Sequence, residues 1–209
     1  TDSVAGNDTL NGNAGDDVLV ASGGNDTLDG GIGADTLTGG AGIDTFVIRS
    51  GDGGSSISDA DTITDFTDGT DIIGMSGLNY SDLTIEQSDS DVLIKKGSEV
   101  LTKIQNLTSS NLNYYDVVSA STTAQTINGT SSDDILLGGS GNDTFTTDTG
   151  TDVVLGYGGD DGITIDGAGD KTIDGGAGTN TASITYSGLT GLQDFPTRSL
   201  DSDYTLSLI

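Results

Sequence analysis

A nine-residue interval runs through two parts of the sequence and constrains the fold more than any other feature. In the first part, glycine, aspartate and an apolar residue recur at this spacing, as in GGIGADTLT at residues 30–38. The same frame returns in the second part, as in GGSGNDTFT at residues 138–146. Columns that keep one register over so many units are typical of a solenoid, in which each repeat stacks on its neighbours.

Three columns define the repeat. The first contains Gly6, Gly15, Gly24, Gly33, Gly42, Ser132, Gly141, Gly150 and Gly159. Two residues further along, the second contains Asp8, Asp17, Asp26, Asp35, Asp44, Asp134, Asp143, Asp152 and Asp161. The third contains Leu10, Leu19, Leu28, Leu37, Phe46, Leu136, Phe145, Val154 and Ile163. The frame is absent from the intervening residues.

Each unit can be interpreted physically as a turn followed by a short strand. The glycines allow backbone conformations that other residues avoid, and the strand after the aspartate directs one apolar side chain inward. Two units make one coil of a flattened parallel roll, so that residues 18 apart stack on the same edge. The resulting core is thin for a chain that must order so many glycines. We therefore expect additional stabilisation in the turns, where carboxylates of neighbouring coils converge.

Composition indicates what would bind there. The chain has 33 acidic and 6 basic residues, a formal charge of −27, and neither His nor Cys. Such a charge makes nucleic acid and anionic membranes poor partners, and no apolar run is long enough for membrane insertion. Absence of His and Cys removes the usual ligands of transition metals and the usual general base. Aspartate and carbonyl oxygens suit calcium, so several Ca²⁺ ions are the expected cofactor.

At this level of detail the units resemble a known family. GGIGADTLT and GGSGNDTFT are similar to the RTX, or hemolysin-type, calcium-binding nonapeptide repeat of secreted bacterial proteins. The resemblance covers residues 3–49 and 126–167. It implies a parallel β-roll with calcium bound between consecutive turns on each edge.

The resemblance also implies which residues bind the metal. Carried over by position, it pairs Asp8 with Asp26, Asp17 with Asp35, Asp26 with Asp44, Asp134 with Asp152, and Asp143 with Asp161. Carbonyl groups of Gly30, Gly31, Gly33, Gly39, Gly40, Gly42, Gly138, Gly139 and Gly141 would complete the ligand shells. Asp61 follows Asp44 at close to the coil interval and is expected to close the last site.

The predicted fold class is all-β, with two tandem parallel rolls that are each followed by an antiparallel cap. The expected division is roll 1 at 1–49, a cap at 50–118, a linker at 119–125, roll 2 at 126–182, and a second cap at 183–209.

Several features are expected within the first cap. Residues 59–78 resemble the segment that follows the roll in serralysin-type secreted proteins, where it forms antiparallel strands. The alternation at 91–104 predicts a hairpin around Lys96-Gly97-Ser98. A short helix is expected at 109–118. Asp65, Asp68 and Asp71 are interpreted as a solvated loop edge.

The repeat loses its register after Ile163. Lys171 takes the aspartate position if Gly169 sets the phase, whereas counting 18 from Asp152 gives Asp170; a one-residue bulge would reconcile the two. Further along, Asn180 replaces the acid and would be a weaker ligand. Two interpretations of Lys171 stay open: its ammonium stands in for one calcium ion, or it covers a solvated surface.

The sequence thus predicts a calcium-binding, calcium-dependent folding module that is not itself an enzyme. The resemblance implies an extracellular, secreted or cell-surface protein exported by type I secretion. A structural or adhesive role is favoured, as in an S-layer or adhesin, with self-association or a cell-surface partner. One alternative is the C-terminal module of an exported enzyme whose catalytic domain lies outside this chain. Another is an ice- or sugar-binding surface, because Thr9, Thr27 and Thr45 should stack as a ladder.

Overall fold

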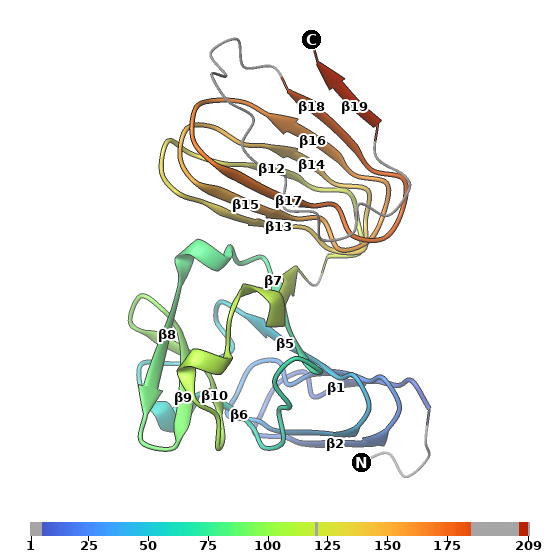
Figure 1. Cartoon of the computed structure of the whole chain (residues 1–209). Helices are drawn as coiled ribbons and strands as arrows, with labels where there is room; N and C mark the ends of the chain where they lie inside the picture. Colours follow the sequence, from blue (N-terminus) through green and yellow to red (C-terminus); the bar gives the residue numbers. More distant parts are fainter. Residues whose placement is uncertain (1–5, 120, 185–204, 209) are drawn as a thin grey trace. The chain divides into compact units, whose positions relative to one another are not determined.

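The computed structural model describes residues 6–119, 121–184 and 205–208, the last as a strand without side-chain detail. The chain divides into two compact units, unit 1 (Thr1–Val118) and unit 2 (Ser119–Ile209). The described residues form β-strands joined by tight turns and short 3₁₀ helices (Figure 1). Within these ranges, no helix is long and apolar enough to cross a membrane.

Unit 1 is a parallel β-roll. From β1 to β7 its strands alternate between two sheets, so that the chain passes from one sheet to the other at each turn (Figure 1). Thr9 pairs with Thr27 and Thr27 with Thr45, which confirms the expected offset of 18 residues between coils. One sheet has the order β1 (Thr9–Asn11), β3 (Thr27–Asp29), β5 (Thr45–Arg49), β7 (Ile72–Ser76) and β11 (Val117–Ser119). The other has the order β2 (Val18–Gly23), β4 (Thr36–Ala41), β6 (Asp61–Ile63), β10 (Glu99–Ile104), β9 (Asp91–Lys96) and β8 (Leu83–Ser88).

The roll of unit 1 continues further along the chain than the sequence predicted. β6 and β7 lie in the segment 59–78, which was expected to form antiparallel strands, yet they pair in parallel with β4 and β5. Thr36 is opposite Thr62 and Thr45 is opposite Ile72, so the coil interval has grown beyond 18. The cause is the longer connection between β5 and β6, which includes the short helix η1 (Ile57–Asp59). The direction of the strands is unchanged.

Antiparallel pairing begins at β8, after the short helix η2 (Tyr80–Asp82). β9 and β10 form the predicted hairpin, and β8 pairs in antiparallel with β9. β10 also pairs in parallel with β6, which joins this meander to the roll. The short helix predicted at 109–118 is instead two 3₁₀ turns, η3 (Ser109–Asn111) and η4 (Tyr114–Asp116). Asn113 and Asp116 cap η4, and such side-chain bonds to the backbone favour a short turn over a continuous α-helix.

Unit 2 is a second parallel roll. Thr126 is opposite Thr144 and Thr144 is opposite Gly162, again 18 apart, but Gly162 is opposite Thr181, which is 19 further on. Thr146 still pairs with Thr164, which is 18 residues further on, whereas the Thr147 hydroxyl accepts the amide of Asp166, which is 19 further on. The extra residue is therefore Ile165. One sheet contains β12 (Thr126–Asn128), β14 (Thr144–Thr146), β16 (Gly162–Ile165), β18 (Thr181–Ile184) and β19 (Thr205–Leu208). The other contains β13 (Ile135–Leu137), β15 (Asp152–Leu155) and β17 (Lys171–Asp174).

Both ends of unit 2 differ from expectation. In the segment predicted as a linker, two residues bond to the roll. The Ser119 amide donates to the Gly138 carbonyl at 3.0 Å, and the Ser121 carbonyl accepts from the Ser140 amide at 3.1 Å. At the other end, the strands described within 183–209 belong to parallel pairs: β18 pairs with β16, and β19 with β18. The antiparallel second cap is therefore wrong for these strands. The rest of that predicted cap, 185–204 and 209, lies outside the described residues.

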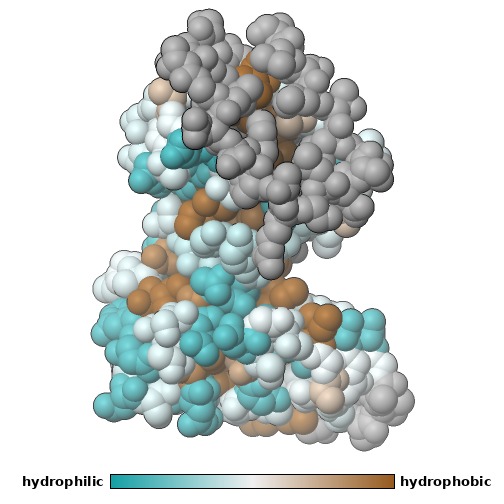
Figure 2. Space-filling view, viewed as in Figure 1, coloured by the Kyte–Doolittle hydropathy of each residue, from teal (hydrophilic) through white to brown (hydrophobic). Residues whose placement is uncertain are grey.

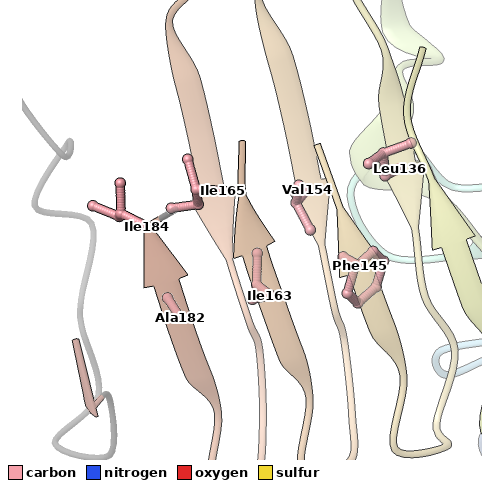
Figure 3. Packing of buried hydrophobic residues seen from close by; sticks show 7 residues of the cluster. All are labelled: Leu136, Phe145, Val154, Ile163, Ile165, Ala182 and Ile184. Carbon is pink, nitrogen blue, oxygen red and sulfur yellow. The ribbon is translucent and has the colours of Figure 1, made fainter. Parts of the chain in front are cut away.

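The core of each roll is one layer of inward side chains. In unit 2, Leu136 and Val154 come from one sheet and face Phe145 and Ile163 from the other (Figure 3). Ile165, Ala182 and Ile184 extend this row along the roll. The column of apolar residues seen in the sequence thus forms the core, which is as thin as expected.

Unit 1 repeats this arrangement. Leu28, Leu37, Phe46, Ile63 and Ile73 are at most 1% exposed, and each comes from a different strand of the roll. On the face of this unit that Figure 2 shows, hydrophilic residues cover much of the surface, with hydrophobic ones scattered among them. Apolar side chains are also buried in the antiparallel part of this unit, where Leu93 and Val100 pack with Ala60.

Candidate metal centres

Each turn has six residues and ends at the aspartate of the repeat, as in GGIGAD at residues 30–35. The sixth residues of successive turns form a row along each edge of the roll, and we call these rows the carboxylate ladder. In unit 1, one carboxylate oxygen (Oδ1) of Asp26 accepts the backbone amide of Asp8 at 2.8 Å, and Oδ1 of Asp44 accepts that of Asp26 at 3.0 Å. On the opposite edge, Oδ1 of Asp35 accepts the amide of Asp17 at 2.7 Å. In unit 2, Asp152 accepts from Asp134, Asp161 from Asp143, and Asn180 from Asp161, at 3.0, 2.7 and 2.8 Å respectively. The structure therefore brings together every aspartate pair that the sequence proposed.

The ladder continues into the segment predicted as a cap, but its aspartates there bond to other residues than the sequence led us to expect. Asp61 was expected to follow Asp44, but its Oδ1 accepts the amide of Asp35 at 3.0 Å. Asp44 instead has Asp71 as its successor, also at 3.0 Å, and the second oxygen of Asp71 accepts from Thr67 at 2.8 Å. Asp71 is buried, so its interpretation as a solvated loop residue is wrong. The longer connection before β6 shifts these aspartates off the nine-residue frame, which hid them in the sequence.

Asp65 also has a structural position. Its two oxygens accept the amides of Gly39 at 3.0 Å and Gly40 at 2.9 Å, so it closes a turn of the roll. Asp68 is exposed, in agreement with the solvated interpretation.

The second oxygen of many ladder carboxylates is buried with no hydrogen-bond donor. Asp26, Asp35 and Asp44 are each only 1% exposed, and their Oδ2 atoms contact no donor. The same holds for Oδ2 of Asp61 and Asp161. An unpartnered buried polar atom normally costs free energy of about 1–3 kcal/mol, and more when it is charged. Recurrence at the same position in successive turns indicates a binding partner rather than a packing defect.

Glycine at the first position of the turn makes room for this oxygen. A Cβ on Gly30 would overlap Oδ2 of Asp35, and a Cβ on Gly39 would overlap Oδ2 of Asp44. The fourth position faces the neighbouring coil. Gly42 has φ of 139°, and a Cβ there would overlap the carbonyl oxygen of Gly24. Carboxylate and carbonyl oxygens of adjacent turns are thus held close together.

Burial without a counter-charge alters the acidity of these groups. It raises the pKa of Asp61 to about 8, and the nearby carboxylates of Asp35 and Asp52 act in the same direction. Burial likewise raises the pKa of Asp161 to about 6 and raises the pKa of Asp44. In each case an amide one coil earlier opposes the shift. Among the described residues, no cationic side chain forms an ion pair with these three carboxylates.

Comparison with known families now identifies the repeats. The model of the RTX calcium-binding nonapeptide repeat matches residues 4–28, 12–46 and 124–163. Residues 4–46 and 124–163 are therefore RTX-type repeats. RTX repeats bind calcium, and the two matched parts lie within the two rolls, which continue beyond them.

Solved structures include similar RTX-type modules. The chain is 29% identical to the AlgE6R3 subunit and 26% identical to the AlgE6R2 subunit of the Azotobacter vinelandii mannuronan C5-epimerase. Each alignment covers 56% of this chain, and 80% and 89% of those chains, with TM-scores of 0.38 and 0.37. Comparison with the curated proteins gives no match.

The RTX turns around the unpartnered oxygens fit calcium. The donors are carboxylate and carbonyl oxygens without nitrogen or sulfur, which is the ligand chemistry of a hard cation. Among the described residues, no three acidic side chains converge on one point. A cation in these turns would therefore take part of its ligand shell from backbone carbonyls. The turns that end at Asp26, Asp35, Asp44, Asp61 and Asp161 meet these conditions.

Other RTX turns are closed by the chain itself. Oδ2 of Asp143 accepts the amide of Gly139 at 2.9 Å, and Oδ2 of Asp134 accepts the amide and hydroxyl of Thr130 at 2.6 and 3.0 Å. A cation at either place would compete with these donors. Oδ2 of Asp152 is also buried without a hydrogen-bond donor, but it forms an ion pair with the ammonium nitrogen of Lys171 at 2.9 Å. The residues around Asp152 therefore do not fit calcium.

The glycines proposed to supply carbonyl ligands occupy the turns as expected, but several backbone groups there have other partners. The carbonyls of Gly138 and Gly139 accept amides from Ser119 and Gly158, each at 3.0 Å. Gly31, Gly33 and Gly141 pack on the preceding turns, next to Asn13, Gly15 and Thr123. A role of these glycines in metal binding is a proposal that rests on their place beside the ladder.

A second ladder lies one residue before the first and was not anticipated. The side chain of Asn7 accepts the amide of Asn25 at 2.9 Å, and the side chain of Asn25 accepts the amide of Ile43 at 3.0 Å. In unit 2, Asn142 accepts from Asp160 at 2.9 Å. The signal was present in the sequence, because Asn or Asp directly precedes the column aspartate in most units. These bonds link coils through exposed side chains and require no metal.

Unit 1 contains an arginine held among carboxylates. Arg49 forms an ion pair with Asp29 and a second one with Asp52 at 3.5 Å. Burial raises the pKa of Asp52 to about 6, although Arg49 opposes the shift. Arg49 is the last residue of β5 and lies beyond the sixth position of the turn, so it is not part of the ladder, although Asp52 is near enough to raise the pKa of Asp61.

The expected threonine column is present but short. Thr9, Thr27 and Thr45 stand side by side in β1, β3 and β5. The next strand places Ile72 in the column, and in unit 2 Gly162 lies between Thr144 and Thr181. The flat regular array that the ice-binding alternative requires is therefore limited to three residues in unit 1.

Proposed function

We propose that this chain is a calcium-dependent folding module with a structural or adhesive role in a secreted or cell-surface protein. The observation that carries the proposal is the repeated buried carboxylate oxygen without a donor, at Asp26, Asp35, Asp44, Asp61 and Asp161. A bound cation supplies the positive charge that these turns lack. The RTX repeats supply the reason to name calcium.

The chain's own groups prepare the turns for that cation. The amide of the preceding coil holds Oδ1 of each ladder aspartate, which leaves Oδ2 directed into the turn, as in the Asp8–Asp26 and Asp17–Asp35 pairs. Glycine at the first position keeps the turn open for this oxygen. Because the two carboxylates come from successive coils, the assembled arrangement exists only in the folded roll. A ligand that binds only the native state stabilises it by mass action.

The proposed location follows from affinity and charge. Extracellular calcium modules have dissociation constants of ~10⁻⁴–10⁻³ M, well above cytosolic calcium concentrations. With a formal charge of −27, the chain repels itself when the ions are absent. We infer folding on arrival in a calcium-rich medium, with binding rather than catalysis as the activity of this chain.

Circular dichroism during a calcium titration tests the proposal. The full chain in excess chelator should have little β-sheet signal and should gain it as calcium rises into the millimolar range. Magnesium at the same concentration is the control and should have a much smaller effect, because it prefers a smaller octahedral shell with retained waters. A full β-sheet signal in excess chelator would contradict the proposal.

A further inference from the structure

One turn of the second roll carries its own cation. Lys171 stands opposite Asp152 in the strand register, so it occupies the sixth position of its turn, where the other turns have aspartate or Asn180. This settles the register question raised by the sequence. Asp170 is not in the column, and its carbonyl accepts the amide of Asp152 at 2.9 Å. The extra residue Ile165 shifts the whole coil and leaves the six-residue turn intact.

The Lys171 side chain is directed into the turn. Its side chain is 6% exposed and that of Asp152 is 0% exposed. The ammonium nitrogen lies 2.9 Å from Oδ2 of Asp152, 2.7 Å from the carbonyl oxygen of Gly150 and 3.4 Å from that of Ala168. These oxygens belong to two successive turns, as the oxygens around a cation in the roll would. A lysine on a solvated surface would show neither this burial nor these contacts.

We propose that the Lys171 ammonium permanently replaces calcium between the turn 147–152 and the turn 166–171. This inference rests on the proposed calcium function. It assigns one place in the roll where the chain neutralises a ladder carboxylate without a metal. The comparison with Asp35 and Asp161 supports it. The Oδ2 atoms of all three aspartates are buried without a hydrogen-bond donor, but of the three only that of Asp152 forms an ion pair, with Lys171 at 2.9 Å. This coil of unit 2 can therefore close on this edge at calcium concentrations that leave the other turns empty.

Counting bound calcium tests the inference. Lys171→Asp restores the acidic column and removes the ammonium, so the full-length variant should bind one more calcium ion per chain than the natural sequence, by native mass spectrometry or equilibrium dialysis. Lys95→Asp is the matched control, since Lys95 forms an ion pair with Glu86 at the surface of the antiparallel meander and lies outside the ladder. The control should bind the same number of ions as the natural chain. An unchanged count for Lys171→Asp would overturn the inference.

A crystal of the natural chain grown in saturating calcium decides the matter even if Lys171→Asp does not fold. Anomalous scattering should show calcium in turns such as those that end at Asp26 and Asp35, and none beside Lys171. Calcium ligated by Asp152 would refute the replacement while leaving the proposed function intact. Absence of calcium from every turn would instead refute the proposed function.

Discussion

At the scale of the residue, the two oxygens of a ladder carboxylate have separate roles. In Asp35, Oδ1 accepts the amide of Asp17 and connects two coils, whereas Oδ2 is buried without a donor. Asp35→Asn retains an oxygen for the first role and removes the charge needed for the second. We expect calcium affinity at this turn to fall at least about tenfold, since even residues that only orient metal ligands have effects of that size. Isothermal titration calorimetry on the full chain measures it.

Asp16→Asn is the matched control for this change. Asp16 is exposed on the same edge, and its Oδ1 accepts the amide of Ala34 at 3.1 Å, a bond that Asn can also make. Both substitutions remove one negative charge, so a general effect of net charge would appear equally in both. Equal losses of affinity would show that Asp35 has no specific role.

Asp71 shows how one residue can extend a repeat beyond its visible pattern. It is buried and accepts amides from Asp44 and Thr67, so Asp71→Ala leaves two donors without a partner. We expect the free energy of unfolding in saturating calcium to fall by about 1–3 kcal/mol. Urea denaturation followed by circular dichroism measures it. Asp68→Ala removes the same charge from an exposed position of the same loop and should change stability little; an equal loss there would contradict the structural role of Asp71.

At the scale of the element, stacking of turns depends on glycine at particular positions. Gly42 has φ of 139° and packs on the carbonyl of Gly24 in the turn below. Gly42→Ala should lower the free energy of unfolding by at least about 1–2 kcal/mol from backbone strain alone, and the overlap with Gly24 adds to that cost. Differential scanning calorimetry in saturating calcium should show a lower melting temperature.

Gly23→Ala provides the control within the same edge. Gly23 is in register with Ala41, so the neighbouring turn already has alanine at this place, and a Cβ would meet the Ala41 carbonyl at 3.6 Å. Its melting temperature should stay close to that of the natural chain. If Gly42→Ala were equally neutral, the close approach of successive turns would have no energetic role.

The period of nine predicted the roll, its coil of two units and its column of inward apolar side chains, because each of these depends only on the spacing of residues within one repeat. Leu28, Phe46 and Phe145 are buried as that pattern requires. Sequence reasoning failed where a connection changed length. The insertion before β6 moved Asp61 and Asp71 off the frame while the parallel stacking continued, and spacing alone cannot show where a longer connection rejoins the roll. Spacing also gave no sign that Ser119 and Ser121, in the segment expected to be a linker, bond to turns of unit 2.

At the scale of the whole molecule, net charge sets the conditions under which the chain can fold. Of 33 acidic and 6 basic residues, two basic ones, Arg49 and Lys171, are held among carboxylates. Most of the excess negative charge must therefore be offset by ions from solution. Calcium and protons compete for the same buried carboxylates, so the effect of pH depends on whether calcium is present.

Apparent calcium affinity should rise with pH between about 5 and 8. Burial raises the pKa of Asp61 to about 8 and that of Asp161 to about 6 in the metal-free fold, against about 3.9 in an unfolded chain. Calcium binds the ionised carboxylate, so at a pH below the pKa the carboxyl group must release its proton before calcium binds. This lowers the calcium affinity of one site roughly tenfold for each pH unit below the pKa. Calorimetric titrations at pH 6, 7 and 8 and constant ionic strength measure the change, in an osmolyte such as trimethylamine N-oxide that keeps the metal-free chain folded. The osmolyte is needed because an unfolded chain has already lost these protons at pH 6. Asp61→Asn should flatten the upper part of the profile, between about pH 7 and 8, and leave the lower part. Equal affinities at pH 6 and 8 would contradict the raised pKa values.

Because of the same groups, the stability of the fold should change with pH in opposite directions with and without calcium. In chelator, the raised pKa values mean that the fold binds more protons than the unfolded chain, so its stability is greatest near pH 4 and is lost as pH rises through about 6 to 8. In saturating calcium, the bound ion lowers the folded-state pKa values of the same carboxylates below about 3.9, so their contribution is present above that value and is lost as pH falls through the lowered ones. Residual β-sheet signal in chelator should therefore be larger at pH 5 than at pH 8, whereas the calcium-loaded chain should unfold only on strong acidification. Circular dichroism at both pH values, with and without calcium, tests the reversal, and the same sign of pH dependence in both conditions would mean that calcium does not bind these carboxylates.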